Sequence, residues 1–146
     1  MRKVCRCGHR MSLGFRLVIY KNVIQVERVP IMECDDCERY EVLPSVKADL
    51  LDMLFQLEEK GESGLILFPD MNELANVLYG LFSNPKLEGE LSEALLIKSC
   101  EERINLLLDL YSCAQKLDDK TWMQQITVRL STLSNYVNGR QVSGAK

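Results

Sequence analysis

Four of the six cysteines form two close pairs near the start of the chain, and this arrangement restricts the fold more than any other feature. The pairs are Cys5/Cys7 and Cys34/Cys37. A tetrahedral zinc ion takes four thiolate or imidazole ligands, which a sequence usually supplies as two pairs whose spacer folds them together. The spacing therefore predicts one Zn²⁺ bound by Cys5, Cys7, Cys34 and Cys37.

The predicted zinc centre is structural rather than catalytic. Four thiolates leave the metal without an open position for water or substrate. His9, the only histidine, follows Cys7 closely and is an alternative ligand. The chain lacks the Gly-rich phosphate-binding and H-E-x-x-H motifs, and one histidine is too few to pair nucleophiles with bases. We therefore expect no catalytic residues and no enzyme activity.

The spacer between the cysteine pairs has the composition of β-strands. Residues 14–32 are rich in β-branched and aromatic side chains, and the polar pair Lys21-Asn22 interrupts them. Such a pattern predicts a hairpin that turns at Lys21-Asn22. After Cys37, an apolar side chain recurs every three or four residues from Pro44 onward, which predicts a helix that ends at Gly61.

The rest of the chain has the periodicity of helices. Asp70 and Glu73 fit a capping box that opens a helix, and longer helices are expected over residues 92–117 and 121–137. A short polar turn between the two long helices predicts an antiparallel helical hairpin.

The expected fold class is α+β, a small β zinc ribbon followed by an all-α domain. We place the ribbon with its trailing helix at residues 1–60 and the helical domain, a hairpin plus one shorter helix, at residues 65–140, on either side of a linker-like stretch. Cys100 and Cys113 fall on the first long helix, where buried thiols are the simplest interpretation.

Composition and charge restrict the expected compartment of the protein and its possible partners. No apolar run approaches the roughly 20 residues that a membrane-spanning helix needs, and the N-terminus has no signal-peptide pattern, so we expect reduced thiols in the cytoplasm. Residues 1–32 hold seven Lys or Arg against the single acid Glu27. This positive charge either offsets the thiolates or contacts a polyanion, in which case Arg16, Lys21 and Arg28 are possible nucleic-acid contacts.

The first 60 residues resemble the YgiT-type zinc-finger domain, a small zinc ribbon of bacterial proteins and antitoxins. The likeness consists of Cys7-Gly8, the β-rich spacer, Val29-Pro30-Ile31, the second knuckle Cys34-x-x-Cys37 and the helix that follows. The resemblance implies a structural zinc ion. The family usually has C-x-x-C in its first knuckle, so Cys5-x-Cys7 departs from the pattern.

Two non-catalytic functions are consistent with these features. The first is a bacterial zinc-binding regulator or adaptor that binds a protein partner through its helices; residues 106–133 are similar to the IDEAL-type helical module in Leu107-Leu108-Asp109, Asp119 and Trp122. The second is a DNA-binding, antitoxin-like regulator, because residues 131–140 resemble a phage-repressor recognition helix. The acidic surroundings of that segment disfavour phosphate contacts, so we favour the first function.

Overall fold

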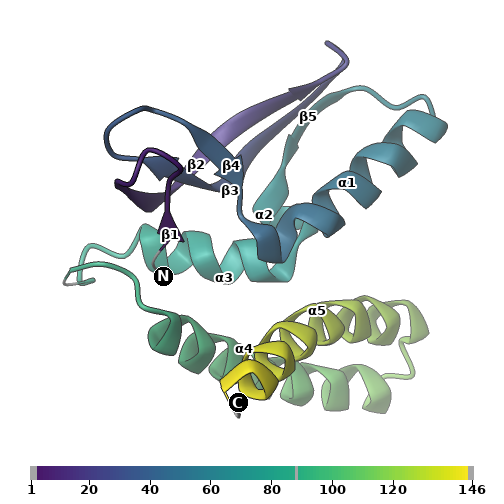
Figure 1. Ribbon diagram of the computed structural model, residues 1–146. Helices are drawn as coiled ribbons and strands as arrows, with labels where there is room; N and C mark the ends of the chain where they lie inside the picture. Colours follow the sequence, from purple (N-terminus) through teal and green to yellow (C-terminus); the bar gives the residue numbers. More distant parts are fainter. Residues whose placement is uncertain (1–2, 88, 145–146) are drawn as a thin grey trace. The chain divides into compact units, whose positions relative to one another are not determined.

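The computed structural model describes residues 3–87 and 89–144, with side chains described as far as residue 140. The chain divides into two compact units, Met1–Glu90 and Leu91–Lys146, which we call the sheet unit and the hairpin unit. The α+β fold class is confirmed, since an antiparallel sheet precedes the long helices (Figure 1). On this part of the chain, no helix combines the length and the hydropathy needed to cross a bilayer.

The sheet unit is built around one long hairpin. Strands β2 and β3 pair antiparallel along most of their length, β1 pairs with the start of β2, and β4 pairs with the end of β3. A fifth strand joins the start of β3 in parallel. The strands are β1 (Lys3–Val4), β2 (Arg10–Tyr20), β3 (Ile24–Cys34), β4 (Tyr40–Val42) and β5 (Gly64–Leu67).

The predicted turn at Lys21-Asn22 is confirmed. Both residues have positive φ, 50° and 60°, and the Val23 N–H donates to the Tyr20 carbonyl at 3.2 Å. Positive φ at both central positions matches the twist of the flanking strands, and asparagine tolerates it well.

A β-bulge lies in the middle of the long hairpin. Arg16 pairs with Val29 and Val18 with Val26, so two residues of β3 lie opposite the single residue Leu17. One of the two, Arg28, has a φ of 60°. The extra residue bends the strand and places the Arg28 guanidinium 4.7 Å from the centre of the Tyr79 ring.

Three helices complete the sheet unit. As predicted, α1 (Pro44–Glu59) begins at proline, and it buries Val46, Leu50 and Leu54. The short α2 (Phe68–Met71) and α3 (Glu73–Phe82) both contact β3. Phe15 of β2 packs edge-on against Tyr79 and Phe82 of α3, with ring centres 5.1 and 5.0 Å apart.

The predicted cap of the third helix is wrong by two residues. Asn72, not Asp70, caps α3, because its side chain accepts a hydrogen bond from the Ala75 N–H at 3.0 Å. Asp70 lies inside α2, a single turn that Phe68 and Pro69 anchor in the core. The sequence pattern predicted a single helix start in this segment, whereas the chain begins two helices there, α2 and α3.

The predicted boundary at residues 60–65 lies inside the sheet unit. β5 follows that stretch directly and pairs with β3, and the Gly64 N–H donates to the Val23 carbonyl at 3.0 Å. The glycines therefore form a tight connection within one unit rather than a linker between two. The division of the chain falls at residues 90 and 91.

The hairpin unit consists of two long helices, as predicted. Ser92 caps α4 (Glu93–Lys116) by accepting from the Leu95 N–H, and Asp119 accepts from the Trp122 N–H at the start of α5 (Lys120–Gly144). The two helices pack against each other through small and branched apolar side chains. Those buried are Leu96, Cys100, Leu107, Ala114, Ile126, Leu133 and Val137.

Candidate metal centre

The strand pairing brings the two cysteine pairs together. Cys5 and Cys7 lie in the tight loop between β1 and β2, and Cys34 and Cys37 lie at the turn between β3 and β4. Met11 of β2 pairs with Cys34 of β3, so both loops emerge at the same end of the sheet. The hairpin predicted from the spacer sequence therefore brings the two cysteine pairs together.

All four sulfurs lie within 4.8 Å of one another. The Sγ atoms of Cys5 and Cys37 are 3.5 Å apart, and those of Cys7 and Cys34 are 3.4 Å apart. A tetrahedron with Zn–S bonds of about 2.3 Å has sulfurs about 3.8 Å apart, whereas a disulfide bond is about 2.0 Å long. The spacing therefore fits four ligands of one metal ion, and all four cysteines are free thiols.

The second knuckle has the backbone of a metal-binding turn. The Sγ of Cys34 accepts the N–H groups of Asp36 and Cys37, both at 3.4 Å. Glu38 then takes a φ of 64°, which turns the chain back into β4. These donors stabilise a negative sulfur before any metal arrives.

The first knuckle closes in a different way, as its shorter spacing requires. The Gly8 N–H donates to the Cys5 carbonyl at 2.9 Å, and the Cys5 N–H donates to the His9 carbonyl at 2.9 Å. Gly8 has a φ of 90°, a conformation that few other residues adopt. The loop thus turns Cys7 towards Cys34 although only one residue separates it from Cys5.

The pKa values of Cys34 and Cys7 are shifted in opposite directions. The N–H groups of Cys37 and Asp36 lower the pKa of Cys34 to about 6. For Cys7 the His9 backbone lowers the pKa, but the Cys34 sulfur, burial and the other two sulfurs together raise it to about 12. The hydrogen bonds therefore favour the thiolate form of Cys34, and a bound cation would displace protons from the cluster.

His9 lies beside the four-sulfur cluster rather than in it. Its Nδ1 is 3.4 Å from the Cys7 Sγ and 3.5 Å from an Asp36 carboxylate oxygen, and all three side chains are exposed. Cys5 and Cys34 are buried, at 8% and 3% exposure. The compact ligand set is thus the four cysteines, and the Cys7–His9–Asp36 group on its outer side was not foreseen from the sequence.

The three cations predicted as possible nucleic-acid contacts are all engaged within the sheet unit. Arg16 pairs with Glu33 at 2.6 Å and stacks 4.3 Å from the Tyr40 ring centre. Lys21 pairs with Glu58, and Arg28 lies over the Tyr79 ring. These contacts lie within the sheet unit and stabilise the packing of its strands and helices.

The segment 131–140 lies within an uninterrupted helix. α5 runs from Lys120 to Gly144, so the chain makes no turn before Ser131. A helix-turn-helix motif needs such a turn ahead of its recognition helix. The resemblance to a repressor helix is therefore one of local sequence only.

The two remaining cysteines differ from each other. Cys100 is fully buried, as predicted, and burial raises the pKa of its thiol to about 11. Cys113 is exposed, so its predicted burial is wrong. α4 presents apolar side chains over more of its circumference than α5 covers, and position 113 lies on an uncovered side.

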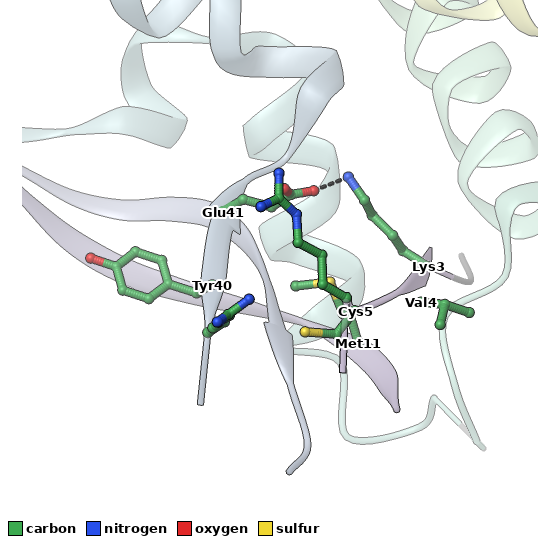
Figure 2. A pocket seen from close by; sticks show the side chains of 8 residues that line it. Lys3, Val4, Cys5, Met11, Tyr40 and Glu41 are labelled. Carbon is green, nitrogen blue, oxygen red and sulfur yellow. Dashed lines mark hydrogen bonds and ion pairs between the residues drawn. The ribbon is translucent and has the colours of Figure 1, made fainter. Parts of the chain in front are cut away.

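A cavity of about 340 Å³ lies beside Cys5 of the four-sulfur cluster. Cys5 and Met11 line it together with residues of β1 and β4, and Figure 2 shows the Lys3 ammonium paired with the Glu41 carboxylate at its edge. Arg6 and Arg39 also line this cavity. Sequence reasoning missed it because Arg6 and Arg39 meet only once the two knuckles are brought together.

Comparisons with models of protein families, with curated proteins and with solved structures each found no match to this chain.

Proposed function

We propose that the protein is a non-catalytic regulator or adaptor in which one structural Zn²⁺ ion, held by Cys5, Cys7, Cys34 and Cys37, organises the sheet unit. The observation that carries the metal centre is the cluster of four sulfurs within 4.8 Å of one another. Soft thiolate ligands in a tetrahedral set favour zinc over magnesium, calcium or manganese.

The donor set supports a structural rather than a catalytic role. Four protein ligands complete the coordination of zinc, so no position is left for a reacting water or carbonyl. The ion would cross-link β1–β2 to β3–β4 at the end of the sheet where each loop has few apolar contacts of its own. The resemblance of residues 1–60 to YgiT-type zinc ribbons agrees with this role.

The proposed protein-binding surface lies on the hairpin unit. Leu106 of α4 and Leu117, the residue that caps its C-terminal end, are 53% and 71% exposed. They are about three helical turns apart and so lie on one side of the helix, next to the stripe that packs on α5. Exposed leucines aligned along a helix are typical of a surface that binds another helix or an apolar groove.

Metal analysis of the purified protein tests the first part of the proposal. We expect one zinc ion per chain, and replacement by Co²⁺ should give the intense thiolate-to-metal absorption of a tetrahedral four-sulfur site. Cys34→Ser should abolish both signals, whereas Cys113→Ser, an exposed thiol outside the cluster, should leave them unchanged. A wild-type protein without bound metal, prepared under reducing conditions, would refute the centre.

A charge-placement experiment tests the second part. Leu106→Glu with Leu117→Glu puts two charges on the proposed surface, whereas the matched control Asn105→Glu with Ser112→Glu puts two charges on the polar side of the same helix. We expect cross-linked protein partners recovered from cells to be lost with the first variant and kept with the second. Equal recovery of partners with both double variants would show that the partner binds a different surface of the protein.

A further inference from the structure

The arginines that the structure describes in the sheet unit fall into two groups. Arg10 pairs with Glu90, Arg16 with Glu33, and Arg28 lies over the Tyr79 ring. Arg6 and Arg39 are exposed, and in the described part of the chain their guanidinium groups have no acidic, aromatic or hydrogen-bonding partner. Both of these arginines line the same cavity beside the cysteines.

The other charges at the cavity cancel. Lys3 forms an ion pair with Glu41, so this pair contributes no net charge and only one carboxylate faces the space (Figure 2). The two arginines therefore give the lining side chains other than Cys5 an excess of positive charge. At about 340 Å³ the cavity is near the lower end of the volumes of small-molecule sites.

Arg6 and Arg39 can compensate the charge of the proposed metal centre and still keep their hydrogen-bond donors available. Four thiolates and Zn²⁺ carry a net charge near −2, which nearby arginines counter at longer range. Among the described contacts, however, no guanidinium donates to a cysteine sulfur, and the Cys34 sulfur accepts backbone N–H groups instead. Each guanidinium thus keeps five N–H donors for another acceptor.

We propose that this cavity binds the phosphate group of a small phosphorylated molecule through Arg6 and Arg39. A guanidinium presents a planar fork of donors that matches two oxygens of a phosphate, and two such groups suit a dianionic phosphate monoester. The inference rests on the proposed metal centre, because Arg6 lies between Cys5 and Cys7 and Arg39 follows Cys37. The metal would hold both arginines at the cavity.

Calorimetric titration of the full-length, zinc-loaded protein tests the site with three probes: inorganic phosphate, adenosine monophosphate and a short single-stranded oligonucleotide. We expect saturable binding of inorganic phosphate or adenosine monophosphate, and binding of the oligonucleotide alone would overturn the assignment to a small molecule. Arg6→Gln with Arg39→Gln should weaken the small-molecule binding about tenfold or more, the effect of losing hydrogen bonds to a charged group. The matched control Lys47→Gln with Lys60→Gln removes the same charge from exposed positions in α1 and at its C-cap, and should bind as the wild type does.

The pattern of probes identifies the source of the phosphate. Binding of phosphate or the mononucleotide, lost with the arginine substitutions, assigns the site to a small metabolite; loss of oligonucleotide binding alone assigns it to a nucleic-acid backbone. Binding that is equal in the arginine and lysine variants, or no binding of any probe, would overturn the inference.

Zinc content, measured on every sample, separates this inference from the proposed function. Zinc-loaded protein without phosphate binding leaves the metal centre intact and removes the phosphate site. Protein that holds no zinc, yet loses phosphate binding with the arginine substitutions, refutes the metal centre and retains the cavity as a phosphate site.

Discussion

The two units are held together by contacts of different range in the sequence. In the hairpin unit, α4 and α5 follow directly from helical periodicity, and only a short turn separates them. In the sheet unit, Cys5 meets Cys37 and β3 pairs with β5, contacts between residues far apart in the chain. The first kind of unit forms from local preference and one packed stripe, whereas the second must bring distant segments together before their contacts can stabilise it.

The largest expected effect breaks the sheet unit and spares the hairpin unit. Cys34→Ser removes one ligand of the proposed zinc ion, and a structural zinc centre contributes on the order of 10 kcal/mol to folding. We expect hydrogen exchange, followed by mass spectrometry, to show lost protection over β1 to β4 and unchanged protection in α4. Cys113→Ser is the control, and full protection of the strands in a zinc-free Cys34→Ser protein would contradict the prediction.

The second effect destabilises the hairpin unit and spares the sheet unit. Leu107→Ala opens a cavity between α4 and α5, where the leucine is fully buried. Such substitutions lower the free energy of unfolding by about 2–5 kcal/mol. Thermal unfolding monitored by circular dichroism should show the loss in helical signal while the Co²⁺ spectrum of the four-sulfur site stays unchanged.

Leu108→Ala is the matched control for that experiment. Leu108 is the next residue on the same helix and is 49% exposed. Its truncation should change the stability little. Equal destabilisation by both substitutions would show that the packing of α4 differs from the one described.

A third, smaller effect tests the helix cap. Asn72→Ala removes the side chain that accepts the Ala75 N–H, which should lower the free energy of unfolding by about 1 kcal/mol. Asp70→Ala removes the residue that the sequence pattern favoured and should change it much less. Urea denaturation of the two variants measures the difference, and the opposite ranking would restore Asp70 as the cap.

The smallest effect concerns the tip of the long hairpin. Hydrogen bonds from Lys21 and Tyr20 lower the pKa of Glu58 below its ordinary 4.5. The carboxylate is therefore favoured in the folded state, so its contribution is present above pH 4.5 and is lost as the pH falls through the lower, folded value. Because the pair is exposed, Glu58→Gln should lower Tm by only about 1–3 °C at pH 7.

The pH dependence identifies the cause of that shift. The difference in Tm between the wild type and Glu58→Gln should shrink as the pH is lowered from 5 towards 3. A difference that stays constant over this range would assign the effect to packing of the longer side chain rather than to its charge.

Sequence reasoning anticipated the features that depend on neighbouring residues. The turn at Lys21-Asn22, the start of α1 at Pro44 and the start of α4 near residue 92 all follow from local sequence preferences. It missed β5, because residues 60–64 have the composition of a linker and the apolar run that follows them is short. Only pairing with β3 turns these residues into a strand.

In the candidate site, too, some features could be predicted from the sequence and others depend on the folded structure. The spacing of the cysteines selected the four sulfurs that the structure brings within 4.8 Å. The roles of the cations could not be predicted in this way: Arg16 and Arg28 had the same apparent availability as Arg6 and Arg39. An ion pair and ring contacts in the folded sheet unit separate the two groups.

By itself the sequence determined the helices, the hairpin turn and the two cysteine pairs, because each depends on residues a few positions apart. The tertiary structure decided that β5 belongs to the sheet, that the chain divides at residue 90, and that Arg6 and Arg39 share one cavity. Those features depend on which distant segments pair, and periodicity and spacing along a single chain do not encode that choice.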